Sequence, residues 1–263
     1  MPAFERTRRR LLIAALVAAF GPMGPNHALA TEESNAPGED PIAREIVRKA
    51  DEIRFPRSGF QVDIRIESKN GENQQDSRTY RVLSKGSEDS VVLTMEPASE
   101  RGQALLMKGR DLWVFLPSVS QPVRLSLAQR LTGQVANGDL ARANFSGDYV
   151  PRILRTEDYD GEKNQVLELK AADRGVTYAK VIYWVREKDG RPQKAEFYSL
   201  SGRLLKTCRY EDYKRMAGTS RPTRLVMEDA LKKGEISVLS YSEMAEKDLP
   251  DKLFTKEYLK KLQ

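Results

Sequence analysis

The residue types that do chemistry are few in this chain, and their spacing matches no catalytic or metal-binding motif. There is one Cys, Cys208, and one His, His27. Carboxylates are abundant, but they alternate with Lys and Arg, as in the stretch 211–215, which is typical of solvated strand faces rather than of paired catalytic acids. The sequence contains no nucleophile elbow, phosphate-binding loop, dinucleotide fingerprint or EF-hand loop. We therefore predict a protein that is not an enzyme and that uses no metal and no other cofactor.

Residues 1–30 have the features of a cleaved secretory signal peptide. Four Arg precede the apolar run 11–20, and helix-breaking Gly and Pro then lead to the small-residue site 28–30. Such a run is too short to span about 30 Å of hydrocarbon, so we expect cleavage rather than a membrane anchor. The string 7–12 also resembles a twin-arginine export signal. The mature protein is then expected in the periplasm of a Gram-negative bacterium, without a membrane-spanning segment.

Cleavage of the leader would remove His27 and half of the net charge. Without His there can be no His-based metal site, Ser-His-Asp triad or Cys-His dyad. A hydrolase would then need carboxylates or a Ser-Lys pair, and no local pattern indicates either. The whole chain carries a net charge of +6 and the leader holds four Arg and one Glu, which leaves about +3 on the remaining 233 residues. This near balance, together with the expected compartment, argues against a nucleic-acid partner.

The rest of the chain predicts a single domain over 40–263, mainly β with a few helices, behind a disordered arm over 31–39. Residues 60–67 alternate strictly between apolar and polar, which favours an antiparallel strand with one wet face. Turn residues such as Asp160-Gly161 separate the later strand-like runs. The further strands are expected near 78–84, 90–96, 103–108, 111–116, 151–158, 164–171, 176–187, 192–199, 203–213, 221–230 and 235–244. A single sheet of roughly ten strands must curl to bury its apolar face.

Short helices are expected to cover the open side of this curved antiparallel sheet. Asp40-Pro41 is a typical helix start, and Pro56 ends the amphipathic segment that follows. Residues 125–148 lack strand character and predict two short helices, capped by Ser126 and Asn137. Residues 255–262 predict another capped helix at the C-terminus.

Two strand-like runs are apolar on both faces, which sets them apart from their alternating neighbours. They are 112–116 and 181–185, and Phe197-Tyr198 follows in the next strand after the second. A strand of this kind is covered on both sides. It is either core beneath a packed helix or the wall of a ligand cavity, and composition alone favours core because apolar pockets are few in any protein.

Five segments, taken in order, resemble the outer-membrane lipoprotein-sorting protein family, also called LolA-like. The likeness spans nearly the whole mature chain. The segments are KGRDLWVFLPSVSQPVRLSL (108–127), NGDLARANFSGDYVPRIL (137–154), GRLLKTCRYEDYK (202–214), RPTRLVMEDALKKGEISVLSY (221–241) and DLPDKLFTKEYLKKL (248–262).

This resemblance implies an unclosed antiparallel β-barrel whose opening is plugged by helices over an apolar cavity. It also implies a soluble carrier of acylated cargo, and it favours the cavity interpretation over the core interpretation. The residues then expected in the lipid-binding wall are Trp113, Phe115, Tyr183, Phe197, Tyr198 and Met227. Those expected in the lid are Leu127, Leu131, Leu140 and Phe145.

The partners implied by the resemblance are the acyl chains of a lipoprotein or lipid, an inner-membrane transporter and an outer-membrane acceptor. An alternative to the carrier hypothesis assumes the same fold but a different function. LolA-like domains also occur as regulatory or accessory proteins that bind the periplasmic segment of a membrane partner in exporter or envelope-stress pathways. Those proteins typically carry a second C-terminal domain, of which we find no sign in this sequence.

Overall fold

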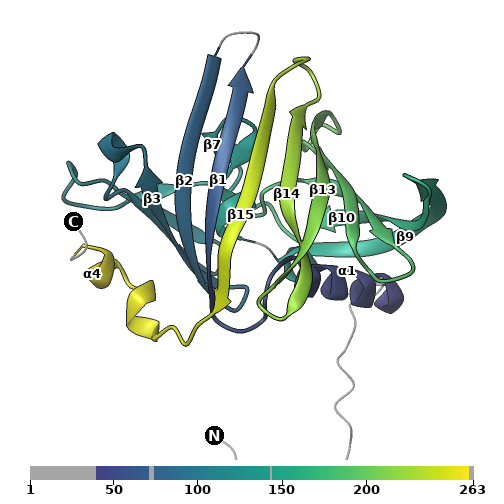
Figure 1. Cartoon of the computed structure of the whole chain (residues 1–263), viewed down its shortest axis with the longest axis horizontal. Helices are drawn as coiled ribbons and strands as arrows, with labels where there is room; N and C mark the ends of the chain where they lie inside the picture. The colour runs from purple at the N-terminus through teal and green to yellow at the C-terminus, as the bar shows by residue number, and fades with distance from the viewer. Residues whose placement is uncertain (1–39, 71–73, 143, 261–263) are drawn as a thin grey trace, which may run out of the picture. The chain divides into compact units, whose positions relative to one another are not determined.

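The computed structural model describes residues 40–70, 74–142 and 144–260, and the expected leader and arm lie outside this part of the chain. One large antiparallel sheet dominates it (Figure 1). Its strands are β1 (Phe60–Asn70), β2 (Gln74–Lys85), β3 (Asp89–Glu96), β4 (Ala104–Lys108), β5 (Asp111–Phe115), β6 (Val123–Leu125), β9 (Tyr149–Tyr159), β10 (Glu162–Ala171), β11 (Lys180–Arg186), β12 (Pro192–Tyr198), β13 (Leu204–Met216), β14 (Thr219–Asp229) and β15 (Ile236–Glu246).

The 13 strands lie in the order β6-β5-β4-β3-β2-β1-β15-β14-β13-β12-β11-β10-β9. Strands adjacent in the sheet are neighbours in the chain except at one place, where β1 pairs with β15 and so joins an N-terminal meander to a C-terminal one. The edge strands β6 and β9 are not paired with each other, so the barrel is unclosed. The predicted fold class, mainly β with one curved antiparallel sheet, is confirmed.

Alternating burial explains why these segments form strands with one covered face. In β1 the side chains of Val62, Ile64 and Ile66 are buried while those between them are more exposed. We call the face that carries these three residues the inner face and the opposite one the outer face. The predicted turn between β9 and β10 is also present, since Asp160 and Gly161 both adopt positive φ, at 53° and 76°.

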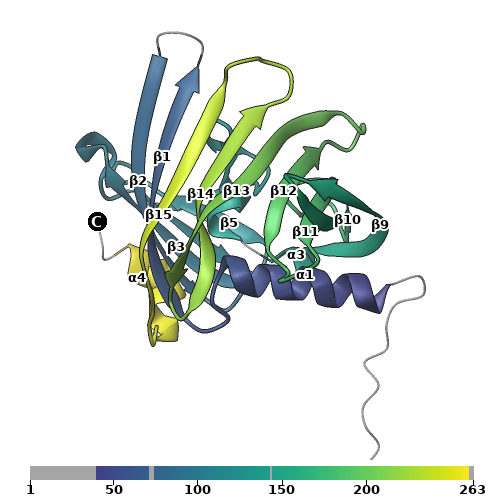
Figure 2. The ribbon, with the colours of Figure 1, turned by 45° about the vertical axis from the view of Figure 1, so that its right-hand side comes forward.

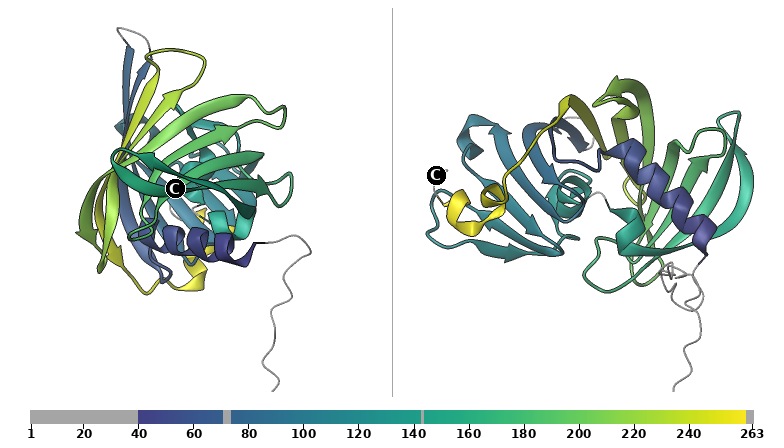
Figure 3. Two further views of the ribbon diagram at one scale, coloured as in Figure 1. Left: turned by 90° about the vertical axis from the view of Figure 1, so that its right-hand side faces the viewer. Right: turned by 90° about the horizontal axis from the view of Figure 1, so that it is seen from below.

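Helix α1 (Pro41–Arg54) begins as expected, because the Asp40 carboxylate accepts hydrogen bonds from the backbone N–H groups of Ile42 and Ala43, both at 3.0 Å. Its buried stripe, which includes Ala43 and Val47, packs against the inner face. Figures 2 and 3 show α1 running across the sheet below the strand ends. None of the helices in the described ranges is long and apolar enough to cross a membrane.

Residues 126–148, which we call the cover, also pack on the inner face. The cover contains a two-stranded ribbon and two short helices, namely β7 (Arg130–Thr132), β8 (Val135–Ala136), α2 (Asn137–Ala141) and α3 (Phe145–Asp148). Three further short elements lie elsewhere, namely η1 (Ala98–Glu100), η2 (Asp251–Phe254) and α4 (Lys256–Leu259). The C-terminal helix is capped by Thr255, as expected.

The prediction of a helix capped by Ser126 is wrong, because the chain forms the ribbon β7–β8 there. Gly133 makes the ribbon turn at φ +49°, and a Cβ on it would lie 2.0 Å from Ser68 Oγ and 2.3 Å from Ser237 Oγ. The turn is anchored by Gln134 N, which donates to Ser237 Oγ at 2.9 Å. Close contact with two serines of the sheet therefore overrides the local helix preference. The second helix exists, but Asn137 is its first residue rather than its cap.

Candidate functional site

The inner face carries one continuous apolar cluster, which we call the interior. It combines side chains from both meanders with side chains of α1 and of the cover. Tyr183, Phe197 and Met227 belong to it, with exposures of 0%, 2% and 3%. The structure therefore brings these three predicted wall residues together.

The expected placement of Trp113 and Phe115 in the cavity wall is corrected by the structure. Strand alternation turns both to the outer face, because Leu112 on the same strand belongs to the interior. There they join a second cluster, in which the C-terminal segment supplies Leu249, Phe254 and Leu259. The ring of Trp113 also lies 3.9 Å below the Lys256 ammonium. Residues 112–116 are apolar on both faces because the C-terminal segment covers the outer one.

Tyr198 likewise does not reach the interior. A register shift between β12 and β13 falls between Phe197 and Tyr198, and Tyr198 packs on a third, outer-face cluster with Val166, Ile182 and Trp184. Its hydroxyl donates to Glu196 at 2.7 Å. The both-face apolar run 181–185 thus has one face in the interior and one in this outer cluster.

All four predicted lid residues lie in the cover and contact the interior. Leu127, Leu140 and Phe145 are buried in it, at 2%, 5% and 8% exposure, and Leu131 packs against it half-buried. The Phe145 ring meets that of Tyr183 edge-on, with centroids 5.4 Å apart. The cover thus closes the interior with its own apolar side chains.

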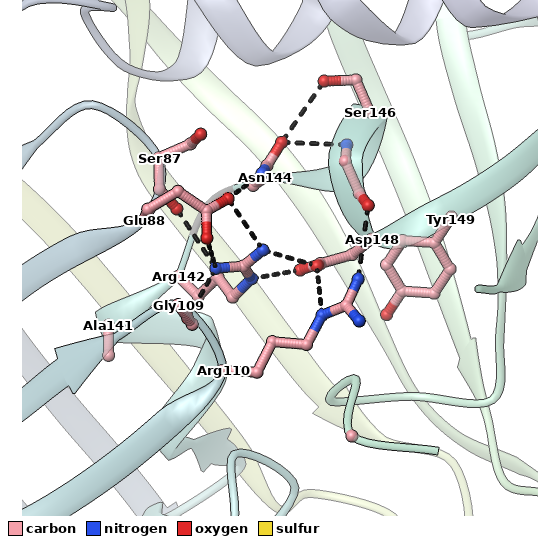
Figure 4. Close-up of polar contacts among 12 residues, drawn as sticks. Ser87, Glu88, Gly109, Arg110, Ala141, Arg142, Asn144, Ser146, Asp148 and Tyr149 are labelled. Atoms are coloured by element: carbon pink, nitrogen blue, oxygen red, sulfur yellow. Dashed lines mark hydrogen bonds and ion pairs between the residues drawn. The ribbon is translucent and has the colours of Figure 1, made fainter. Parts of the chain in front are cut away.

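Polar contacts hold the cover to the sheet, and the first group centres on Arg142 and Asp148 (Figure 4). Arg142 donates through Nε and Nη2 to the two carboxylate oxygens of Asp148, at 2.5 and 2.7 Å. Its Nη1 donates to the Gly109 carbonyl oxygen at 2.7 Å. Arg110, next to Gly109, donates to Asp148 at 3.2 Å. The end of the cover is therefore fixed to the β4–β5 hairpin.

A second group fixes α2 to β13. The Lys206 ammonium is 2.5 Å from Asp139 Oδ2 and donates to the Gln134 carbonyl oxygen at 2.5 Å. Asp139 also accepts from the Tyr178 hydroxyl at 2.8 Å and from Ala136 N at 2.8 Å. Burial, followed by the charge of Asp139, raises the pKa of Tyr178 well above its ordinary value, so its hydroxyl stays a donor.

A third group fixes α3 to α1. Arg44 donates to the Tyr149 carbonyl oxygen at 2.8 Å, and Asp51 Oδ2 accepts from Ser146 N at 2.7 Å. Burial raises the pKa of Asp51 to about 6, against the lowering effect of Arg54. The Arg54 guanidinium lies 4.4 Å from the centre of the Phe145 ring.

The pockets around Arg54 are small. Two pockets that it borders measure about 20 Å³ and 10 Å³. Sites that hold drug-sized ligands usually measure about 300–1,000 Å³. A larger pocket of about 270 Å³ lies beside the interior, between the C-terminal end of α1 and the cover, and includes Asp51, Phe55 and Asn144 in its lining. A further pocket of about 190 Å³ is lined by interior residues of the N-terminal meander such as Tyr80 and Leu105. Around Arg54, however, the two small pockets leave no room for a long chain without movement of the surrounding side chains.

Sequence reasoning missed the charged residues of the interior. Arg54 continues the buried stripe of α1 four residues after Ala50, and Lys206 occupies an inward position of β13 two residues before Cys208. A charge at a position that the periodicity assigns to the core is the pattern that could have identified both. In the described residues no group of three or more His, Cys, Asp or Glu is arranged to hold a metal ion.

Comparison with known proteins places this architecture in a family. A family model described as an uncharacterized protein matches residues 86–261. No curated protein matches the sequence. Among solved structures, the LolA superfamily protein NE2245 from Nitrosomonas europaea is 63% identical, with 82% of this chain and 98% of that chain covered and a TM-score of 0.79.

Two more distant structures share the fold. A domain from Vibrio parahaemolyticus described as an outer membrane lipoprotein-sorting protein is 23% identical, covering 84% of this chain and 99% of its own, with a TM-score of 0.72. A DUF1329 family protein from Desulfovibrio piger is 20% identical, covering 83% and 98%, with a TM-score of 0.73. On the match to the Nitrosomonas protein, which is extensive in both coverage and identity, this chain belongs to the LolA superfamily.

Proposed function

We propose that this protein is a soluble periplasmic carrier, which holds the acyl chains of a lipoprotein or lipid in its interior and moves them between the inner and outer membranes. The observation that carries the proposal is the continuous apolar interior closed by a cover that is not part of the large sheet. The leader expected from the sequence and the membership of the LolA superfamily support the same role. An inner-membrane transporter would load the carrier and an outer-membrane acceptor would unload it.

The energetics of the cover suit a carrier that must open. Burying one methylene group is worth about 0.8 kcal/mol, so burying a dozen methylenes of an acyl chain contributes roughly 10 kcal/mol to its binding. The entropy lost when the chain is ordered reduces this value. Opening separates α2 from β13 and exposes both Lys206 and Asp139 to water. A buried ion pair is worth little net free energy when both partners are rehydrated together. This pair therefore sets the position of the cover without locking it.

Uptake of a fluorescent fatty acyl probe tests the proposal. The wild-type protein should take up the probe saturably, and Asp139→Asn should take it up faster because the charge that pairs with Lys206 is lost. Asp63→Asn is the matched control, since it breaks an ion pair of 2.7 Å with Arg81 on the outer face. Faster uptake by both variants would show that the effect comes from general loosening.

A protein that takes up no probe under any condition would contradict the carrier role. The regulatory alternative would then be pursued by searching for a membrane protein whose periplasmic segment binds the delipidated chain.

A further inference from the structure

Four cationic side chains are buried in the described part of the chain, and three of them have partners for their donors. Arg142 is surrounded by carboxylates and carbonyl oxygens, and Lys206 contacts Asp139, a carbonyl oxygen and a sulfur atom. Arg221 donates to four carbonyl oxygens at distances of 2.5–3.4 Å. Arg54 is the exception. Within the described residues its single polar contact runs from Nη1 to Asp51 Oδ1 at 3.5 Å.

Apart from this contact with Asp51, the described residues give the N–H donors of the Arg54 guanidinium no acceptor. Its faces meet aromatic rings, with centroids at 4.4 Å for Phe145, 5.7 Å for Phe55 and 5.8 Å for Tyr210. Cation–π contacts stabilise the charge but use none of the N–H donors in the guanidinium plane. The side chain is only 7% exposed, so water reaches these donors only through the small pockets that Arg54 borders.

A second buried group in the same place also lacks a partner. The Tyr183 hydroxyl is one of two buried side-chain polar atoms in the described residues without a hydrogen bond, the other being Asn164 Oδ1. Tyr183 shares its neighbours with Arg54, because its ring lies 5.4 Å from that of Phe145 and 6.1 Å from that of Tyr210. Burial raises the pKa of Tyr183 well above its ordinary value, so the group is a donor at neutral pH.

We propose that Arg54 and the Tyr183 hydroxyl form a head-group site for an amphiphile whose acyl chain ends in a carboxylate. The carboxylate accepts from the free edge of the guanidinium and from the Tyr183 hydroxyl, and the chain runs along the apolar interior. This inference rests on the proposed function and narrows its cargo to a free fatty acid. It goes beyond the apolar contacts that any acyl chain would make.

The shape of the site favours a carboxylate over a phosphate. A carboxylate is planar and matches the edge of a guanidinium through two parallel hydrogen bonds. A phosphate monoester is tetrahedral and brings a larger negative charge next to Asp51. The two pockets that Arg54 borders, of about 20 and 10 Å³, are small, so the smaller and flatter group needs the smaller rearrangement of the side chains around them.

Displacement of a fluorescent acyl probe by three matched amphiphiles tests the site. Dodecanoate, dodecanol and dodecyl phosphate share one chain and differ in the head group. A hydrogen bond to a charged group is worth about 1.5–3 kcal/mol, which is roughly a tenfold to hundredfold change in affinity. Dodecanoate should therefore bind at least about tenfold more tightly than dodecanol.

Two variants test whether the preference for dodecanoate over dodecanol comes from Arg54 and Tyr183. Arg54→Gln should abolish it, and Tyr183→Phe should reduce the dodecanoate-to-dodecanol ratio by about tenfold. Tyr183→Phe keeps the test valid if Arg54→Gln fails to fold, because the hydroxyl that it removes has no hydrogen-bond partner among the residues that the structure describes. Tyr198→Phe, which removes a hydroxyl on the outer face, is the control and should keep the wild-type ratio.

The possible results separate the site from the proposed function. Equal binding of dodecanoate and dodecanol, or a preference that survives both substitutions, would overturn the head-group site while leaving the carrier role intact. Tighter binding of dodecyl phosphate than of dodecanoate would overturn the choice of a carboxylate. Failure of all three amphiphiles to displace the probe would contradict the carrier role itself.

Discussion

At the scale of single residues, the interior combines an apolar lining with a few charges that hold its cover. Removing one partner of a buried pair leaves an unpaired charge and is costly, whereas exposing both partners to water is cheap. The Lys206–Asp139 pair therefore gives the cover one position when closed, at little net cost in free energy when the cover opens. Apolar packing alone would leave that position less defined.

The Lys206–Asp139 pair provides a direct test of whether two buried charges stabilise the closed cover as a unit. Lys206→Met and Asp139→Asn should each lower the free energy of unfolding by about 3 kcal/mol, because each leaves its partner buried and unpaired. The double variant should lose less than the sum of the two, since it leaves no unpaired charge. Urea unfolding of the four proteins measures the coupling. Strict additivity would show that the pair does not act as a unit.

Asp51 predicts a pH dependence of stability. Its pKa rises from 3.8 in the unfolded chain to about 6 in the folded one, so the folded state binds more protons between these values. Its contribution to stability is therefore greatest below about pH 4 and is lost as the pH rises through 6, a change of roughly 3 kcal/mol at most. Wild-type stability minus that of Asp51→Asn, measured by urea unfolding from pH 4 to 7, should fall by an amount of this order. A flat difference would contradict the raised pKa.

At the scale of elements, the two faces of the sheet are covered by different parts of the chain. The cover and α1 pack on the inner face, and the C-terminal segment packs on the outer face near β3–β5. This division explains why the run 112–116 is apolar on both faces, whereas the outer face of 181–185 packs with side chains of neighbouring strands such as Val166 and Tyr198. Periodicity showed that both faces of 112–116 were covered but could not show by what, because the covering segments lie far away in the sequence.

Truncating one buried side chain in each of the two covering segments should separate an effect on the stability of the fold from an effect on the rate of acyl-probe uptake. Phe254→Ala removes a fully buried side chain of the outer cluster and should lower the free energy of unfolding by about 3–5 kcal/mol. Leu140→Ala in the cover should cost about 2–5 kcal/mol. Thermal unfolding and stopped-flow uptake of an acyl probe check both. Only the Leu140 variant should take up the probe faster, and faster uptake by the Phe254 variant would contradict the assignment of the interior as the binding face.

At the scale of the whole molecule, the sequence was sufficient to predict the sheet but insufficient to predict which residues form the candidate site. Strict alternation in strands such as β1 and turn residues such as Asp160-Gly161 predicted a curved antiparallel meander, because these preferences are local. The face of Trp113 and Phe115 and the ribbon at Gly133 depend on contacts between distant segments. The outward position of Tyr198, by contrast, follows from strand alternation once its neighbour Phe197 points inward. The positions of Arg54 and Lys206 could be read from periodicity, but what surrounds them could not, because Phe145 and Asp139 come from the cover.

Native mass spectrometry of residues 31–263, purified from a bacterial periplasm without detergent, tests the carrier role most directly. We predict an adduct that organic solvent removes and that is a lipid or an acylated peptide, with a fatty acid as the species expected from the Arg54 site. A clean mass for the bare chain, together with no uptake of an added acyl probe, would contradict a carrier and direct attention to a protein partner.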